Sequence, residues 1–225
     1  MQTDLRYPGL QYQPDPMQGR VAGSIRKFLR AQFGSPSGFW GNVVGQIMAR
    51  SSSNQDRIRW TLSLLDLQAT DRVLEIGFGP GIAIDLASKI ATDGFVAGVD
   101  HSEVMVRQAA GRNAKRIQSK KVALHLGSAS NLPRFAEPFD KIFTINSIHF
   151  WKDPVDCLKG LRELLKPGGV IAVTMQPRSR SATDATTRTI GTEIVGDLER
   201  AGFSNCRLEI KMAKPISVAC VLASK

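Results

Sequence analysis

Residues 73–81 read Val-Leu-Glu-Ile-Gly-Phe-Gly-Pro-Gly, and this stretch decides the fold. Its first half has the apolar residues of a buried strand, and its second half has glycine at every other position. Because glycine permits tight turns and close approach of the backbone to a ligand, the stretch predicts a buried strand and a turn that opens a helix. Open α/β sheets bind ligands at such turns. Glycine also allows a helix to pack closely on a strand, so the turn alone is weak evidence for a ligand.

Asp100 strengthens the interpretation of this turn. It ends the next predicted strand, about 23 residues after Gly77, where a carboxylate can accept hydrogen bonds from both hydroxyls of a ribose. The pair predicts a nucleoside-bearing cofactor. Nicotinamide enzymes use the same geometry, but their motif is GxGxxG, whereas this chain has GxGxG followed by Ile82 and no Tyr-x-x-x-Lys pair downstream. An NAD(P)-dependent oxidoreductase is therefore the second hypothesis.

After Asp71 the sequence alternates short apolar runs with helical patterns, which is typical of a doubly wound α/β fold with a mostly parallel sheet. The clearest helix begins after Asp153-Pro154, an N-cap residue followed by proline at the first helical position. The run Lys166-Pro167-Gly168-Gly169 ends that helix. Strands are predicted over residues 72–77, 95–100, 121–127, 139–146 and 169–175.

The C-terminal part predicts one more helix, near residues 187–201, which ends at Gly202. Two apolar runs follow, over residues 206–213 and 216–224, with Lys214-Pro215 between them. Because proline interrupts a strand, the two runs predict an antiparallel pair at the edge of the sheet.

The N-terminal part differs in sequence pattern from the rest of the chain. Residues 1–19 carry three prolines and predict an extended arm. Residues 20–33 have apolar residues at helical spacing and basic residues on the remaining faces, which predicts a short basic amphipathic helix. A second helical pattern runs up to Leu65. We therefore predict an arm and helical cap over residues 1–60, ahead of a domain over residues 61–225.

Composition limits the classes of protein to consider. With 42% hydrophobic and 22% charged residues, the 225-residue chain has the composition of a globular protein, and no apolar run approaches the roughly 18 residues that span a bilayer. The N-terminus lacks the pattern of a secretory signal, which predicts a cytoplasmic location. Three widely spaced cysteines predict neither a disulfide framework nor a metal site.

The chain is basic, with 30 Lys and Arg against 20 Asp and Glu, a formal net charge of +10. This charge raises the attraction to anionic substrates, nucleic acid and acidic membrane surfaces without selecting one of them. Many basic residues fall on expected solvated helix faces, so a generally positive surface is the favoured interpretation. The oligomeric state is left open.

Several motifs in order resemble those of class I S-adenosylmethionine-dependent methyltransferases, particularly the broad small-molecule and quinone-type group. They are VLEIGFGPG, GVDHSEVMVRQA, GSASNLP, FDKIFTINSIHFW and LRELLKPGG, and the match runs from about residue 60 to the C-terminus. The resemblance implies a Rossmann-like methyltransferase fold, S-adenosylmethionine as cofactor and methyl transfer to a small-molecule acceptor. An RNA or lipid methyltransferase is an alternative, although NSIHFW is not the NPPY motif typical of RNA base enzymes.

The resemblance also implies which residues contact the cofactor. The acid and glycines of the turn would line its methionine part, Asp100 would hold the ribose, and His101 with Met105 would flank the adenine. Where the family often has an acid after the third strand, this chain has Ser128, whose hydroxyl is a substitute donor or acceptor. The implied cofactor-binding residues are Glu75, Gly77, Gly79, Gly81, Asp100, His101, Met105, Ser128, Ala129 and Asn146.

The loop over residues 146–151 follows the fourth strand and is the candidate acceptor site. Its His149 has a pKa range suited to a general base, although a role in orienting the loop is favoured. An in-line methyl displacement mainly needs proximity and exclusion of water, so no conspicuous catalytic group is required. We expect the N-terminal segment to close over the site. The predicted acceptor-binding residues are Tyr12, Phe39, Trp40, Phe150 and Trp151, with Tyr7 as a further contact.

Two weaker expectations concern partners. The basic helix over residues 20–33 could make a weak contact with a membrane surface, although packing on its own domain is favoured. Nucleic acid is a less favoured partner than a small molecule. No metal is expected.

Overall fold

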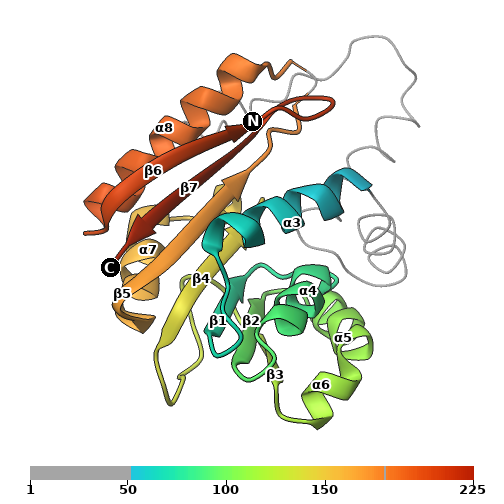
Figure 1. Cartoon of the computed structure of the whole chain (residues 1–225). Helices are drawn as coiled ribbons and strands as arrows, with labels where there is room; N and C mark the ends of the chain where they lie inside the picture. The colour runs from blue at the N-terminus through green and yellow to red at the C-terminus, as the bar shows by residue number, and fades with distance from the viewer. Residues whose placement is uncertain (1–51, 180) are drawn as a thin grey trace.

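The computed structural model describes residues 52–179 and 181–225. In this part of the chain, seven strands form one sheet in the order β3-β2-β1-β4-β5-β7-β6 (Figure 1). The first five strands are parallel, whereas β7 runs antiparallel to both β5 and β6. The predicted doubly wound fold is confirmed. The strands are β1 (Arg72–Ile76), β2 (Phe95–Asp100), β3 (Val122–Leu126), β4 (Phe139–Ile145), β5 (Leu165–Met175), β6 (Ser204–Lys211) and β7 (Val218–Ser224).

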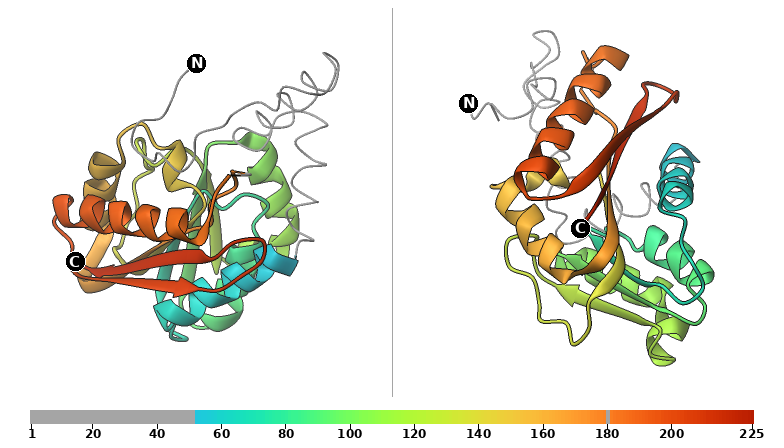
Figure 2. Two further views of the ribbon diagram at one scale, coloured as in Figure 1. Left: turned by 90° about the horizontal axis from the view of Figure 1, so that it is seen from above. Right: turned by 60° about the vertical axis from the view of Figure 1, so that its left-hand side comes forward.

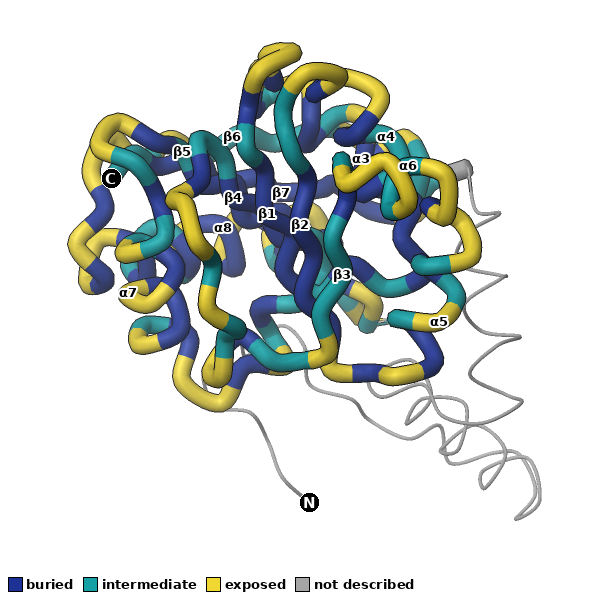
Figure 3. The backbone as a smooth tube through the Cα atoms, turned by 90° about the horizontal axis from the view of Figure 1, so that it is seen from below, coloured by how far each residue is buried: buried dark blue, intermediate teal, exposed yellow. Residues whose placement is uncertain are grey.

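Helices cover both faces of this sheet (Figure 2). Apolar residues of α7 and α8 pack in one core cluster, and those of α3, α4 and α5 pack in the other. Buried residues run through the central strands, while exposed ones gather on loops and outer helix faces (Figure 3). The helices are α3 (Ser52–Leu65), α4 (Ile82–Ile90), α5 (Glu103–Arg112), α6 (Ala114–Gln118), the 3₁₀ turn η2 (Ile148–Phe150), α7 (Pro154–Leu164) and α8 (Asp184–Arg200).

Helix α7 begins where the sequence predicts. The Asp153 side chain accepts a hydrogen bond from a backbone N–H of the first turn, Pro154 starts the helix, and Leu158 is fully buried on its inner face. Strand β5 starts at Leu165, four residues earlier than predicted. The reason is a tertiary contact, because Leu165 pairs with Phe139 of β4 before an irregularity in the register.

The C-terminal antiparallel pair is also confirmed. Strand β7 inserts between β5 and β6, with Val173 opposite Val221, and β6 forms the edge. Helix α8 begins at Asp184, three residues before the predicted start, because the Thr183 side chain accepts a hydrogen bond from the backbone N–H of Thr186.

Helix α3 joins the N-terminal part to the sheet. Ile58 and Leu62 are buried, and the Thr61 hydroxyl lies 2.7 Å from that of Thr174 in β5. Residues 1–51, which include the predicted arm and the basic helix, lie outside the described residues, so the division at residue 60 stays a prediction. None of the helices in the described ranges is both long and apolar enough to cross a bilayer.

Candidate functional site

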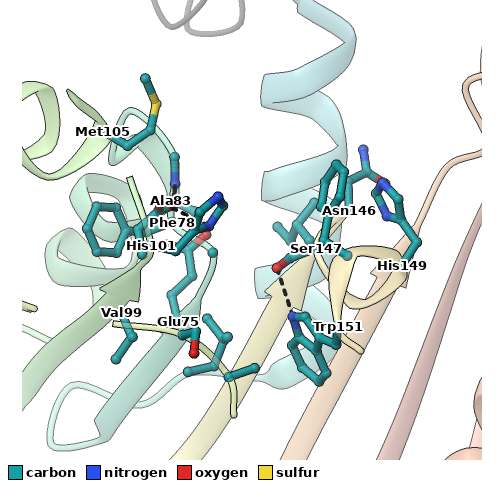
Figure 4. A pocket seen from close by; sticks show the side chains of 18 of the residues that line it. Glu75, Phe78, Ala83, Val99, His101, Met105, Asn146, Ser147, His149 and Trp151 are labelled. Carbon is teal, nitrogen blue, oxygen red and sulfur yellow. Dashed lines mark hydrogen bonds and ion pairs between the residues drawn. The ribbon is translucent and has the colours of Figure 1, made fainter. Parts of the chain in front are cut away.

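A cavity of about 840 Å³ lies at the carboxyl ends of the parallel strands (Figure 4). Its lining comes from the segments that follow β1 to β5 and from the first turns of α3. The carboxyl ends of parallel strands share one edge of a sheet, so residues far apart in the sequence meet in this pocket. Among the predicted site residues that the structure describes, all line the pocket except Gly81. Tyr7, Tyr12, Phe39 and Trp40 lie outside the described residues.

The three glycines of the turn are required for different reasons. All have positive φ angles, which favour glycine. A Cβ on Gly77 would lie 2.4 Å from Oγ of Ser147, and one on Gly81 would lie 2.6 Å from Cβ of Ala109. A Cβ on Gly79 would meet nothing within 4 Å. Gly77 and Gly81 are therefore required by packing, whereas Gly79 leaves space on the pocket side.

The Asp100 carboxylate joins two backbone segments. Its Oδ2 accepts a hydrogen bond from the N–H of Gly79 at 2.8 Å, and its Oδ1 accepts one from the N–H of Ser102 at 2.9 Å. Burial raises the pKa of Asp100, and these hydrogen bonds oppose that shift. Each carboxylate oxygen has a further lone pair, so Asp100 can still accept hydrogen bonds from a ligand.

The Glu75 carboxylate is buried, with 3% of the residue exposed. Its Oε2 has no hydrogen-bond partner within the part of the chain that the structure describes. Burial, followed by repulsion from Asp100, raises the pKa of Glu75 well above its ordinary value. A buried carboxylate oxygen without a partner is costly, and a cationic or donating group of a ligand would satisfy it.

The ends of β2 and β3 form one side of the pocket, where His101 and Met105 face the cavity (Figure 4). The His101 ring is partly exposed, and its Nδ1 lies 3.8 Å from Oδ1 of Asp100. Met105 is buried on α5 yet lines the cavity, so it serves both core and pocket. Ser128 and Ala129 follow β3, and the Ser128 hydroxyl lies 3.1 Å from that of Ser130.

Asn146 begins the loop after β4 on the other side of the pocket (Figure 4). Its φ angle is 53°, and its Oδ1 accepts a hydrogen bond of 2.8 Å from the N–H of Gln176. Its Nδ2 is buried and finds no hydrogen-bond partner among the described residues. This side-chain bond ties the β4 loop to the end of β5 and leaves an amide donor beside the pocket.

The two predicted aromatic contacts in this loop, Phe150 and Trp151, differ in burial. Trp151 is 7% exposed and belongs to the core, and its Nε1 donates a hydrogen bond of 3.2 Å to Oγ of Ser147. Phe150 is 53% exposed. The ring of His149 lies 3.8 Å from that of Phe150, centroid to centroid. All three line the cavity, but Trp151 also supports the fold, while Phe150 is available to a ligand.

The sequence patterns did not indicate the part of the pocket lining that lies beyond β5 and on α3. Arg178 and Ser179 follow β5, and Asn54 and Ile58 lie on the first turns of α3. Arg178 could have been predicted as a pocket residue, because it lies just after a predicted parallel strand. Such positions meet at the ligand-binding edge of the sheet. The sequence held no comparable signal for Asn54, since nothing local places the start of α3 at that edge.

Among residues 52–179 and 181–225, no group of three or more His, Cys, Asp and Glu side chains is arranged to hold a metal ion. The three cysteines are free thiols, and Cys157 contributes to the pocket wall.

Comparisons with known proteins identify the family. A family model described as a methyltransferase domain matches residues 67–194. The chain is 35% identical over 183 residues to the uncharacterized methyltransferase YdaC of Bacillus subtilis (strain 168), and the match covers 81% of this chain and 98% of YdaC. It is 31% identical to the erythromycin 3''-O-methyltransferase of Saccharopolyspora erythraea, over 54% of this chain but only 40% of that protein.

The fold also matches solved structures. One is the N-methyltransferase NodS from Bradyrhizobium japonicum WM9 in complex with S-adenosyl-L-homocysteine, with a TM-score of 0.64 and 16% identity. That match covers 88% of this chain and 97% of NodS. These findings confirm the predicted methyl transfer over the oxidoreductase hypothesis. The chain belongs to the methyltransferase-domain family, and it is an S-adenosylmethionine-dependent methyltransferase.

Proposed function

We propose that this chain methylates a small-molecule acceptor held between the ends of β4 and β5 and the nucleoside side of the pocket. One observation carries the proposal: a single cavity joins Asp100 and His101 on one side to His149 and Phe150 on the other. A volume of about 840 Å³ is of the size that encloses a small ligand. The donor and the acceptor would therefore share one enclosed space.

The residues on the nucleoside side fit the cofactor. Glu75 would face its positively charged methionine part, because Oε2 lacks a partner and a cation would stabilise the buried carboxylate. Asp100 would hold the ribose through its remaining lone pairs. The adenine would lie among the segments after β2 and β3, with contacts from His101, Met105, Ser128 and Ala129. When bound, the cofactor supplies a methyl group already activated on a sulfonium.

The protein's part of the reaction is to hold and enclose the acceptor. The loop after β4 is held by the hydrogen bond between Asn146 and Gln176 at its start and by the burial of Trp151 in the core at its end. A fixed loop keeps an acceptor at attack distance, which accounts for most of what such a transfer needs. His149 lies in this loop and would orient the acceptor or remove its proton.

A methyl-label transfer assay tests the acceptor class. Purified protein with methyl-labelled S-adenosylmethionine is incubated separately with total RNA, protein, lipid and small-metabolite fractions from cells. We expect label in the small-metabolite fraction, and label in RNA alone would contradict the proposal. The basic net charge makes RNA and acidic lipid the informative alternatives. The Asp100→Ala variant serves as the cofactor-deficient control.

The role of His149 is tested once an acceptor is found. If His149 removes a proton, His149→Ala lowers kcat and abolishes the acidic limb of the pH profile. If it orients the loop, His149→Gln keeps most of the activity, and the pH profile does not change. The cytoplasmic location and a weak membrane contact stay predictions.

A further inference from the structure

One arginine, Arg178, lines the pocket after β5, and a second, Arg57, is buried in the adjoining wall without lining the cavity. Arg57 on α3 is 5% exposed, and it donates hydrogen bonds to Oε1 of Gln176 and, at 2.7 Å, to Oδ1 of Asn54. Arg178 lies two residues after Gln176 and lines the cavity. Burial and the nearby charge of Arg178 together lower the pKa of Arg57 to about 10. Arg57 contacts Gln176, two residues before Arg178, so both arginines lie at the end of β5.

Neither arginine forms an ion pair with a carboxylate in residues 52–179 and 181–225. The side chains that accept hydrogen bonds from Arg57 are neutral amides, and its Nε is buried without a hydrogen-bond partner in these residues. Arg178 is exposed and lines the cavity, and desolvation by the surrounding protein lowers the pKa of its guanidinium. A buried guanidinium without a carboxylate partner is unfavourable, and an anionic ligand bound beside it would stabilise the charge.

The neighbouring side chains are held by hydrogen bonds and present donors to the pocket. Gln176 is bonded on three sides, since its Oε1 accepts from Arg57, its Nε2 donates to the carbonyl of Ile216 at 2.7 Å, and its N–H donates to Asn146. This leaves the Nδ2 of Asn146 and the guanidinium of Arg178 as donors on the pocket wall. A guanidinium matches the two oxygens of a carboxylate.

The position of Arg178 favours the acceptor over the cofactor as the source of the anion. Strand order places β5 two strands from β1 and three from β2. Because neighbouring strands are about 4.8 Å apart, the end of β5 lies roughly 10 Å across the sheet from the glycine turn. The acids that fit the cofactor, Glu75 and Asp100, end β1 and β2. Phe150, in contrast, belongs to the loop after β4, the neighbour of β5.

We propose that Arg178, with Arg57 behind it, is a carboxylate-binding site that takes the acid group of the acceptor. The acceptor class is then an acidic small molecule with an apolar or aromatic body, which Phe150 would contact. This inference rests on the proposed function and adds charge selection to it. The methionine part of the cofactor also carries a carboxylate that this site could bind. The test distinguishes that carboxylate from one on the acceptor.

The first arm uses benzoate as the probe and benzamide as its uncharged match, added to protein saturated with S-adenosylhomocysteine. Ligand-observed NMR measures binding. We expect benzoate to bind more tightly than benzamide. Arg178→Gln should lower the affinity for benzoate by about tenfold without changing the affinity for benzamide. Arg178→Lys should keep part of the affinity because it keeps the charge. Arg207→Gln, which removes the same charge from an exposed side chain on β6, is the matched control and should change nothing.

The second arm uses calorimetry to measure the affinities for S-adenosylhomocysteine and for 5′-methylthioadenosine, which lacks the amino-acid carboxylate. We expect Arg178→Gln to leave both affinities within about twofold of the unmodified protein. Loss of S-adenosylhomocysteine affinity alone would assign the carboxylate to the cofactor and overturn the inference. Equal binding of benzoate and benzamide would also overturn it. Failure of the unmodified protein to bind S-adenosylhomocysteine would instead contradict the cofactor assignment.

Discussion

The backbone N–H of Gly79 donates a hydrogen bond of 2.8 Å to Oδ2 of Asp100, and this bond ties the turn after β1 to the end of β2. Oδ1 of the same carboxylate accepts from the N–H of Ser102 at the start of α5. Asp100 therefore shapes the pocket, and we propose that it also binds the cofactor, so its substitution should act on both.

Asp100→Ala should weaken binding of S-adenosylhomocysteine by about 1.5–3 kcal/mol, because hydrogen bonds to a charged group are lost. Asp100→Asn should weaken it less, since one oxygen remains as an acceptor. Calorimetry measures both, with Asp56→Ala on the exposed face of α3 as the control. NAD should give no heat with any of the proteins. Unchanged affinity in Asp100→Ala would contradict the ribose assignment.

Gly77→Ala and Gly79→Ala should separate packing from ligand access. Both residues have positive φ, so either alanine costs about 1–2 kcal/mol of backbone strain. Gly77→Ala should cost about 1–3 kcal/mol more, because its Cβ would overlap Oγ and Cβ of Ser147. Urea denaturation measures the difference. Gly79→Ala should fold and lose cofactor affinity, since its methyl group would enter open space on the pocket side; equal stability of the two variants would count against this distinction.

Glu75→Gln should stabilise the ligand-free protein at neutral pH and weaken cofactor binding. The pKa of Glu75 is raised above its ordinary value of 4.5 in the folded state. Between that value and the raised pKa, the folded protein holds a proton that the unfolded chain has lost, so stability falls as pH rises. Glutamine removes this titration, and the stability advantage of the variant should grow with pH across the window.

Thermal unfolding at several pH values measures this effect, and calorimetry measures cofactor affinity. Glu163→Gln is the control, because that side chain is 76% exposed. If the stability of Glu75→Gln and of the unmodified protein changed with pH in the same way, a raised pKa of Glu75 in the folded state would be contradicted.

Trp151→Ala should mainly lower stability, whereas Phe150→Ala should mainly weaken acceptor binding. Trp151 is buried and bonded to Ser147, so its removal should cost about 3–5 kcal/mol of stability. Phe150→Ala should change stability by no more than about 0.5 kcal/mol, because the side chain is exposed. It should raise KM for the acceptor with little change in cofactor affinity. A KM that stays unchanged would remove Phe150 from the acceptor site.

A truncated chain that begins at Gly19 tests the predicted role of the arm. We expect cofactor affinity to stay close to that of the full chain and turnover to fall sharply, because exclusion of water at the methyl group would be lost. Steady-state kinetics with an identified acceptor measure this. Unchanged kcat and KM would mean that the arm is a tail and not part of the site.

The sequence by itself determined the main elements and which residues after β1 and β2 line the pocket. The glycine turn, Asp100 and the Asp153-Pro154 start of α7 are local signals, since capping, glycine conformations and strand patterns depend on neighbouring residues. The order of motifs along the chain also determined the family. These features were readable because each is complete within a short stretch.

Only the tertiary structure decided how distant segments share the pocket. Arg57 and Gln176 are 119 positions apart and are joined by one hydrogen bond, and nothing local to either residue indicates it. The same holds for the roles of Gly77 and Gly79, which differ because Ser147 lies against only the first. Burial and repulsion raise the pKa of Glu75 through atoms from other strands. Contacts, burial and charge are properties of the assembled sheet, so they appear only when its strands lie side by side.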